Sequence, residues 1–104
     1  MKFNGSYSIE FNLVCTGHVI ELSTNVNLTK EIPINNKSVI IGTLPVGYRP
    51  ASRLIVKPNM TGCIPQIIID TDGTITIANG KDYSNNDCNY PASWFRLEIV
   101  YIAS

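Results

Sequence analysis

Side chains that could recognise a ligand gather late in the sequence, at Tyr83, Asp87, Tyr90, Trp94 and Arg96. Aromatic rings stack on the C–H faces of sugars, while carboxylate and guanidinium groups hydrogen-bond sugar hydroxyls. This mixture is typical of a shallow saccharide site. The other interpretation is structural, with Tyr90 and Trp94 packing this segment onto the fold or filling a subunit interface.

The single histidine, His18, is a sixth candidate contact. It follows Gly17 in "CTGH", a segment that indicates a tight turn. A histidine in such a turn is usually a surface residue, and a ligand contact is the second interpretation. No G-x-S-x-G segment is present, so the sequence does not indicate a nucleophile activated by His18.

Asp70 and Asp72 begin like a calcium loop, but Thr74 and Ile75 stand where a further acid and a glycine are required. The pair Asp72-Gly73 between two apolar runs instead predicts a β-hairpin, because glycine accepts the positive φ of the turn. The eight acidic residues form no recognisable pair for glycoside hydrolysis. We therefore expect no metal, no cofactor and no catalysis.

The charge balance narrows the possible partners. Eight basic and eight acidic side chains cancel, and only 15% of the 104 residues are charged. No basic field is available to gather nucleic acid, and no run of about 18 apolar residues predicts a membrane span. An Asn-, Ser- and Thr-rich surface suits a protein that binds neutral polar ligands or a β-rich subunit of an assembly. The opening "MKFNGSYSIEFN" lacks an apolar signal core, so we expect no signal peptide.

Three widely spaced cysteines, Cys15, Cys63 and Cys88, include no C-x-x-C pair, so a zinc site is not expected. The odd number and the missing signal peptide favour reduced cysteines, with Cys15 buried as a small hydrophobe. Cys63 and Cys88 both lie in loop-like sequence, and a disulfide between them is the alternative.

The elements that must position these residues are strands, because the dominant hydrophobic period is two. "WFRLEIVYI" at residues 94–102 alternates two faces, and the six prolines recur at intervals that would break helices. The predicted strands are about 6–15, 18–28, 37–43, 52–58, 64–70, 74–79 and 93–102, with one further short strand possible. The sequence predicts a single all-β domain over residues 1–104, an antiparallel sandwich or jelly roll. Its longest polar loop is "NGKDYSNNDCNYPA", residues 79–92.

The order of three segments carries a family resemblance. "IGTLPVGYRPASR" at 41–53 is followed by "IIIDTDGTITI" at 67–77 and by "SWFRLEIVYIAS" at the end. Over about residues 7–104 this order resembles the C-terminal β-sandwich domain of tail-tip, baseplate and tail-fibre proteins from phages and prophages of Gram-positive bacteria. These include the receptor-binding heads of lactococcal phages. The matching positions are Leu44, Pro45, Gly47, Tyr48, Arg49, Pro50, Asp72, Gly73, Trp94 and Tyr101.

The resemblance implies a homotrimeric head at the tail tip of a virion, assembled in the bacterial cytoplasm. Such heads usually end a longer protein, so we expect this chain to be an excised domain or a small accessory subunit. Family heads often bind host cell-wall saccharides or teichoic acids, in some cases between protomers. Their saccharide contacts follow no fixed motif, so the resemblance transfers the fold and not the ligand residues.

Physical chemistry gives "LPVGYRP" a structural role. Pro45 ends ladder pairing because it lacks an N–H, Gly47 can take a positive φ, and Pro50 holds its own φ near −65°. The Tyr48 ring can be buried while its hydroxyl finds a backbone partner. We therefore expect a rigid corner that sends the chain from one sheet to the next, with Arg49 in structural or interface pairing, like Arg53.

Three functions follow in order of preference. The first is a non-enzymatic receptor-binding domain that recognises a host surface saccharide. The second is a structural baseplate module, in which exposed apolar positions such as Val100 and Ile102 face another tail protein. The third is a glycan-degrading enzyme, although neither an acid pair nor a nucleophile is visible.

Overall fold

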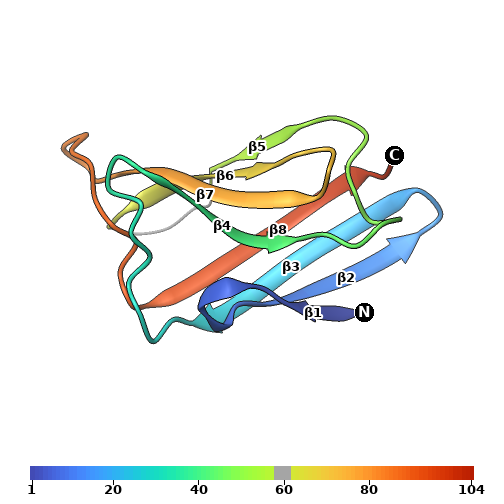
Figure 1. The fold of residues 1–104 in the computed structure, drawn as a ribbon, viewed down its shortest axis with the longest axis horizontal. Coiled ribbons are helices and arrows are strands. Elements are labelled where there is room, and N and C mark those ends of the chain that lie inside the picture. The colour runs from blue at the N-terminus through green and yellow to red at the C-terminus, as the bar shows by residue number, and fades with distance from the viewer. Residues whose placement is uncertain (58–61) are drawn as a thin grey trace.

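Two four-stranded antiparallel sheets pack face to face in the computed structural model, which describes residues 1–57 and 62–104 (Figure 1). One sheet has the order β1-β2-β3-β8 and the other the order β4-β7-β6-β5. The strands are β1 (Lys2–Asn4), β2 (Glu10–Thr16), β3 (Val19–Asn27), β4 (Ser38–Thr43), β5 (Leu54–Val56), β6 (Ile64–Ile69), β7 (Thr74–Lys81) and β8 (Trp94–Ile102). The predicted all-β antiparallel sandwich is confirmed.

The core lies between the sheets and is built by the alternation seen in the sequence. Phe95, Leu97 and Tyr101 of β8 are buried and Ile99 packs against the same core, whereas the alternate residues of the strand are exposed. Strand β7 contributes Ile75 and Ile77 from the facing sheet, both fully buried. Successive side chains of a strand point to opposite faces, so this pattern fixes which face of each sheet is covered.

The first predicted strand, 6–15, is wrong at its beginning. Residues Ser6–Ser8 form a 3₁₀ turn, in which Tyr7 and Ser8 both have φ of 59°. The preceding β1 folds back to pair with β2, so the N-terminal segment contributes a short edge strand of its own. The predicted strand 52–58 is observed as Leu54–Val56, and residue 58 lies outside the described residues.

The Asp72-Gly73 hairpin is confirmed between β6 and β7. Gly73 has φ of 91°, and its N–H donates to the carbonyl of Asp70 at 2.9 Å. The Asp72 carboxylate accepts the N–H of Thr74 at 2.9 Å, and this hydrogen bond lowers the pKa of Asp72. A Cβ on Gly73 would lie 2.7 Å from the Leu44 carbonyl oxygen, so glycine is also required for close packing.

The "LPVGYRP" segment is a corner, but the prediction that it joins the two sheets is wrong. It connects β4 to β5, which are the two edges of the same sheet. Within it the N–H of Tyr48 donates to the Pro45 carbonyl, and Gly47 has the expected positive φ of 96°. The chain thus crosses the end of the sandwich to reach the far edge of its own sheet.

This corner binds the end of β8. Pro50 forms a bridge with Ala103, and the N–H of Ser104 donates to the Arg49 carbonyl at 2.9 Å. The Tyr101 hydroxyl donates to the Tyr48 carbonyl at 2.5 Å. The sequence led us to expect a hydrogen bond from the Tyr48 hydroxyl to a backbone group. In this contact the hydroxyl belongs to Tyr101, and Tyr48 contributes its backbone carbonyl.

Both arginines near the corner have the structural roles expected of them. The Arg49 Nε donates to the Leu44 carbonyl at 3.1 Å, and the Arg49 side chain covers Gly73. Arg53 pairs with Asp70 at 3.3 Å between Nε and Oδ1. Both contacts hold the loop against the β6–β7 hairpin.

The cysteine expectations are corrected by the structure. Cys63 and Cys88 form a disulfide with their Cα atoms 6.0 Å apart, and Cys15 is free and exposed. Cys63 directly precedes β6, and Cys88 belongs to the long polar loop between β7 and β8. No local sequence pattern joins two positions 25 residues apart, so only the folded topology brings them together.

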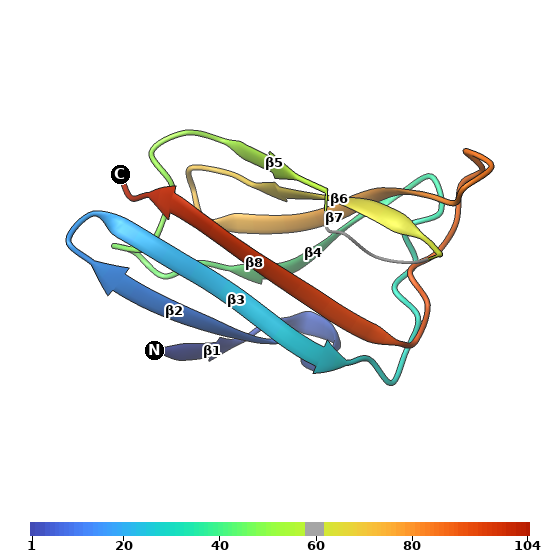
Figure 2. The ribbon, with the colours of Figure 1, turned by 180° about the vertical axis from the view of Figure 1, so that it is seen from behind.

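The molecule is elongated, with extents of 41 × 24 × 19 Å. Both termini lie toward the end that carries the β2–β3 hairpin, and the long loop before β8 lies at the opposite end (Figures 1 and 2). No helix among the described residues is long and apolar enough to cross a membrane.

Candidate functional site: a polar groove on the outer face of one sheet

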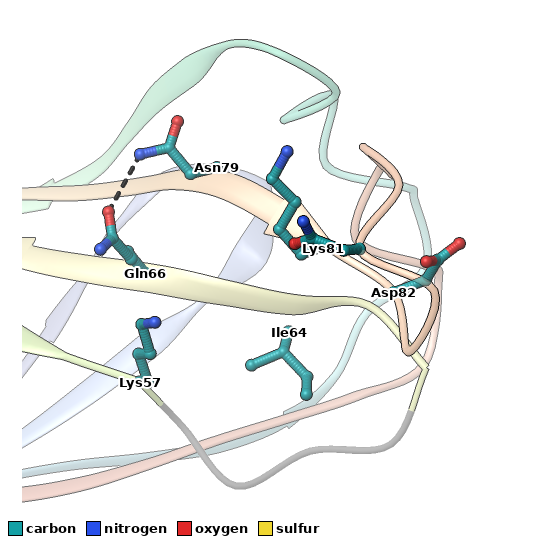
Figure 3. Close-up of a pocket in the computed structure, with 7 residues that line it drawn as sticks. Lys57, Ile64, Gln66, Asn79, Lys81 and Asp82 are labelled. Carbon is teal, nitrogen blue, oxygen red and sulfur yellow. Dashed lines mark hydrogen bonds between the residues drawn. The ribbon is translucent and has the colours of Figure 1, made fainter.

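A groove of about 530 Å³ lies over the outer face of β6 and β7, beside the long loop (Figure 3). Its lining combines amide and charged side chains with one aliphatic residue. The lining residues are Lys57, Ile64, Gln66, Asn79, Lys81, Asp82 and Asn85. The groove volume lies within the usual range of small-ligand sites.

A β-bulge aims the amides into this groove. The pairing of β6 with β7 shifts between Gln66↔Ala78 and Ile64↔Lys81, which leaves one extra residue on β7. Asn79 occupies the bulge with φ of 52°, and its Nδ2 donates to Gln66 Oε1 at 2.9 Å. Bulges of this kind redirect side chains, and asparagine tolerates the left-handed conformation that most residues avoid.

Gly80 and the disulfide support the groove from below. A Cβ on Gly80 would lie 2.4 Å from the Cys88 carbonyl oxygen and 2.6 Å from the Cys63 sulfur. The Cys88 N–H donates to the Gly80 carbonyl at 3.0 Å. Glycine therefore lets the returning loop pack directly on β7.

The turn at one side of the groove is held by its own hydrogen bonds. The Asp82 carboxylate accepts the N–H groups of Ser84 at 2.9 Å and Asn86 at 3.0 Å. Asn85 has φ of 63°, and its N–H donates to the Asp82 carbonyl. Asp82 thus acts as a turn-forming residue, and the amide of Asn85 is presented on a fixed backbone.

The two lysines that line the groove differ in whether they have an ion-pair partner. Lys81 forms an ion pair with Asp87 at 2.5 Å, whereas Lys57 makes no ion pair among the described residues. Amide groups both donate and accept hydrogen bonds, which suits hydroxyl-bearing ligands. The groove can therefore bind a polyhydroxylated molecule, and Lys57 can add an interaction with an acidic substituent.

Two of the six predicted contacts lie in the long loop near the margin of the groove. Asp87 pairs with a lysine that lines the groove, and Tyr83 is 75% exposed beside Asp82. Neither residue lines the groove itself, so both stand at its margin.

The other four predicted contacts are placed elsewhere. Trp94 and Arg96 lie on the outer face of the opposite sheet, where the Arg96 guanidinium stands 5.8 Å from the centre of the Trp94 ring. His18 is exposed in the β2–β3 turn, at the far end of the nine-residue pairing of β3 with β8. The predicted residues therefore do not form one site.

Tyr90 is excluded as a ligand contact because its side chain is only 2% exposed. Its ring packs edge-on against Phe95 at 5.6 Å, and its hydroxyl donates to the Trp94 carbonyl. The backbone of Tyr90 pairs with Ile32, which draws this part of the polar loop into the core. The alternative interpretation of Tyr90 as a packing residue is correct.

Sequence analysis missed Gln66 and Asn79, which carry the amides at the centre of the groove. Both belong to segments predicted as alternating strands, or to their ends, where outward polar residues are ordinary. The one local signal was Asn79-Gly80 at the end of "TITIA", a pair that favours positive φ and a bulge.

Comparisons with protein-family models, with curated proteins and with solved structures gave no match to this chain. The phage-tail resemblance consequently remains an inference from the sequence motifs. Within the described ranges, no three His, Cys, Asp or Glu side chains come together in a way that could hold a metal ion.

Proposed function

We propose that this chain is a non-enzymatic receptor-binding domain of a phage or prophage tail that recognises a host surface saccharide. The observation that carries the proposal is the convergence of Gln66, Asn79 and Asn85 in one groove with Lys57, which has no ion-pair partner among the described residues. A hydrogen-bonded turn holds Asn85, and the hydrogen bond between Asn79 and Gln66 holds the other two amides, so these three groups need little ordering when a ligand binds. The phage setting and the homotrimer rest on the sequence resemblance alone.

Weak single sites are compatible with this function. Shallow polar grooves gain modest affinity per ligand, and several copies on one particle multiply it through effective concentration. A virion tail with trimeric heads would supply that multiplicity. Host cell wall saccharides bearing hydroxyl groups and acidic substituents match the chemistry of the groove.

The test is binding of the purified domain to host cell-wall saccharides on a glycan array. Gln66→Ala and Asn85→Gly each remove one amide, and glycine preserves the positive φ at residue 85. Loss of one hydrogen bond of about 1 kcal/mol should weaken binding roughly fivefold. Asn25→Ala, on the outer face of the other sheet, is the matched control and should bind normally.

Trp94→Ala distinguishes the groove from the late aromatic cluster predicted from sequence. If Trp94→Ala abolishes binding while the groove variants retain it, the saccharide site is on β8 and the groove assignment is wrong. If no saccharide binds the unaltered domain, receptor recognition is contradicted. Release of new reducing ends from host polysaccharide would contradict the non-enzymatic part of the proposal.

One observation favours a second function, a structural module that binds another tail protein. Val14, Val19, Val100 and Ile102 are all exposed on the outer face of the β1-β2-β3-β8 sheet. A structural module of this kind should fail to decorate host cells while binding purified tail proteins. A cell-wall binding assay therefore separates the two functions.

A further inference from the structure

Strand β8 is a long unprotected edge. It pairs with β3 through all nine residues, Trp94 to Ile102, without a bulge, and no described strand pairs with its other side. Exposed edges offer unpaired N–H and C=O groups, and most proteins blunt them. The other three edges here are blunted, since β1 and β5 have three residues each and β4 contains a bulge.

The hydrogen bonds at the end of β8 show which backbone groups point to the open edge. The Ile102 carbonyl accepts from Ala51, and the Ser104 N–H donates to Arg49, both on the edge opposite β3. Ala103 instead donates to His18, on the β3 side. Because the direction alternates along a strand, Arg96, Glu98 and Val100 direct their backbone groups toward the open edge.

The side chains at two of these positions, Arg96 and Glu98, carry opposite charges that form no ion pair among the described residues. Arg96 faces Asn25 across the ladder, and Glu98 faces Ser23. Both side chains are exposed on the outer face of the sheet.

We propose that β8 pairs antiparallel with β8 of a second copy of this chain, about a two-fold axis at Leu97. In this register Arg96 of each copy lies opposite Glu98 of the other, so the pairing makes two reciprocal charge contacts. Trp94 lies opposite Val100 in the same way, an aromatic–aliphatic pair that stabilises sheets. The result is one continuous eight-stranded sheet with a self-complementary contact.

Other two-fold registers are disfavoured. An axis at Glu98 would place two glutamates directly opposite each other, and an axis at Arg96 would do the same with two arginines; like charges in these positions are destabilising. An axis at Ile99 would place Arg96 opposite Ile102, and Ile102 would then have to pair with the second copy. Its carbonyl already accepts a hydrogen bond from the N–H of Ala51. The charge order of β8 and the occupied Ile102 carbonyl therefore favour the axis at Leu97, which places Arg96 opposite Glu98.

The contact is distinct from the homotrimer implied by the sequence resemblance. A two-fold contact uses the same patch on both copies and cannot lie inside a closed ring of three. It would form a dimer from single chains, or join two rings into a six-chain assembly. A mass of two chains or of six chains therefore agrees with the β8 contact. Neither assembly depends on saccharide binding.

The test is solution mass by sedimentation equilibrium over a concentration series, in a Cys15→Ser background that prevents cross-linking through the exposed thiol. The unaltered edge should give two or six chains at high concentration. Glu98→Arg and Arg96→Glu each create like-charge pairs and should abolish the two-fold contact. The double exchange R96E/E98R restores opposite charges in the same register and should restore the mass.

Glu21→Arg is the matched control, because Glu21 is exposed on the same face but lies on the internal strand β3. It should leave the mass unchanged. A particle of one or three chains at every concentration would overturn the proposal, as would a mass that the single exchanges do not alter or the double exchange does not restore.

Trp94 supplies a second readout that needs no variant. It is the only tryptophan in the chain and is 54% exposed, and the proposed pairing covers it with Val100 of the second copy. Its fluorescence emission should shift to shorter wavelength as the concentration rises through the association range. An emission maximum independent of concentration would contradict the proposal.

Discussion

Tyr101 is the residue at which two separate segments of the chain are joined by one buried hydroxyl. Its side chain is 5% exposed, and its hydroxyl donates to the Tyr48 carbonyl. Replacement by phenylalanine leaves that carbonyl without this donor, so the free energy of unfolding of Tyr101→Phe should fall by about 1 kcal/mol at pH 7. Urea unfolding measures the change, and Tyr83→Phe, at an exposed position, should show none.

The same residue predicts an alkaline loss of stability. Burial raises the pKa of Tyr101 from 10.0 to about 12. The unfolded chain therefore releases this proton near pH 10, whereas the folded chain retains it until about pH 12. The contribution of Tyr101 is complete below pH 10 and is lost as the pH rises through this window. Tyr101→Phe should flatten the fall in stability, although burial also raises the pKa of Tyr90.

Glycine is required at residue 80 because neighbouring atoms leave no room for a side chain, and not because of its backbone conformation. A methyl group there would overlap the Cys88 carbonyl and the Cys63 sulfur, so Gly80→Ala should destabilise the fold by about 1–3 kcal/mol. Gly17→Ala is the matched comparison, because Gly17 has φ of +63° but open space around it, and its cost should be about 1 kcal/mol. A smaller loss for Gly80→Ala than for Gly17→Ala would show that packing against the disulfide is unimportant.

At the scale of elements, the disulfide fixes the long loop to the start of β6. It closes a separation of 25 residues, so removing it in C63S/C88S should lower the free energy of unfolding by about 3 kcal/mol. The same variant should weaken saccharide binding, because the Asp82–Asn86 turn is anchored through Cys88. Cys15→Ser, which removes an exposed free thiol, should change neither quantity.

The strands were predictable because their information is local. Alternation in "TITIA" and "WFRLEIVYI" places Ile75 or Leu97 on a covered face without reference to the rest of the chain. The "LPVGYRP" segment predicted the corner at Gly47 but not which strands it connects, since β4 and β5 pair with strands that follow later in the sequence. Sheet membership depends on long-range pairing, which alternation does not encode.

The candidate site was predicted poorly for the same reason. Tyr90 lies in a polar segment, yet its backbone pairs with Ile32 far earlier in the chain and its ring becomes part of the core. Gln66 and Asn79 meet only because a bulge shifts the register between two strands. Sequence composition predicts polar side chains suited to hydrogen bonding, whereas which of them come together in the fold depends on register and loop closure.

At the scale of the whole molecule, the two ends of the sandwich differ in composition and contacts. The corner, the β2–β3 turn and the end of β8 are tied together by backbone hydrogen bonds at one end. The groove, the disulfide and the Asn-rich turn occupy the other. This separation predicts that His18→Ala leaves saccharide binding unchanged, and a glycan array comparing it with Asn85→Gly tests the separation. Equal losses in the two variants would place His18 in the recognition surface.

The position of the termini determines which end of the molecule is exposed when the chain is attached to a surface. Because both termini lie toward the hairpin end, a covalent anchor on either one would hold the opposite end of the 41 Å long body, which carries the long loop, away from the attachment surface (Figure 1). A biosensor surface coated through an N-terminal or a C-terminal tag should therefore capture saccharide equally well. In a Cys15→Ser background, attachment through a cysteine placed at residue 83 would hold the long loop against the surface and block capture.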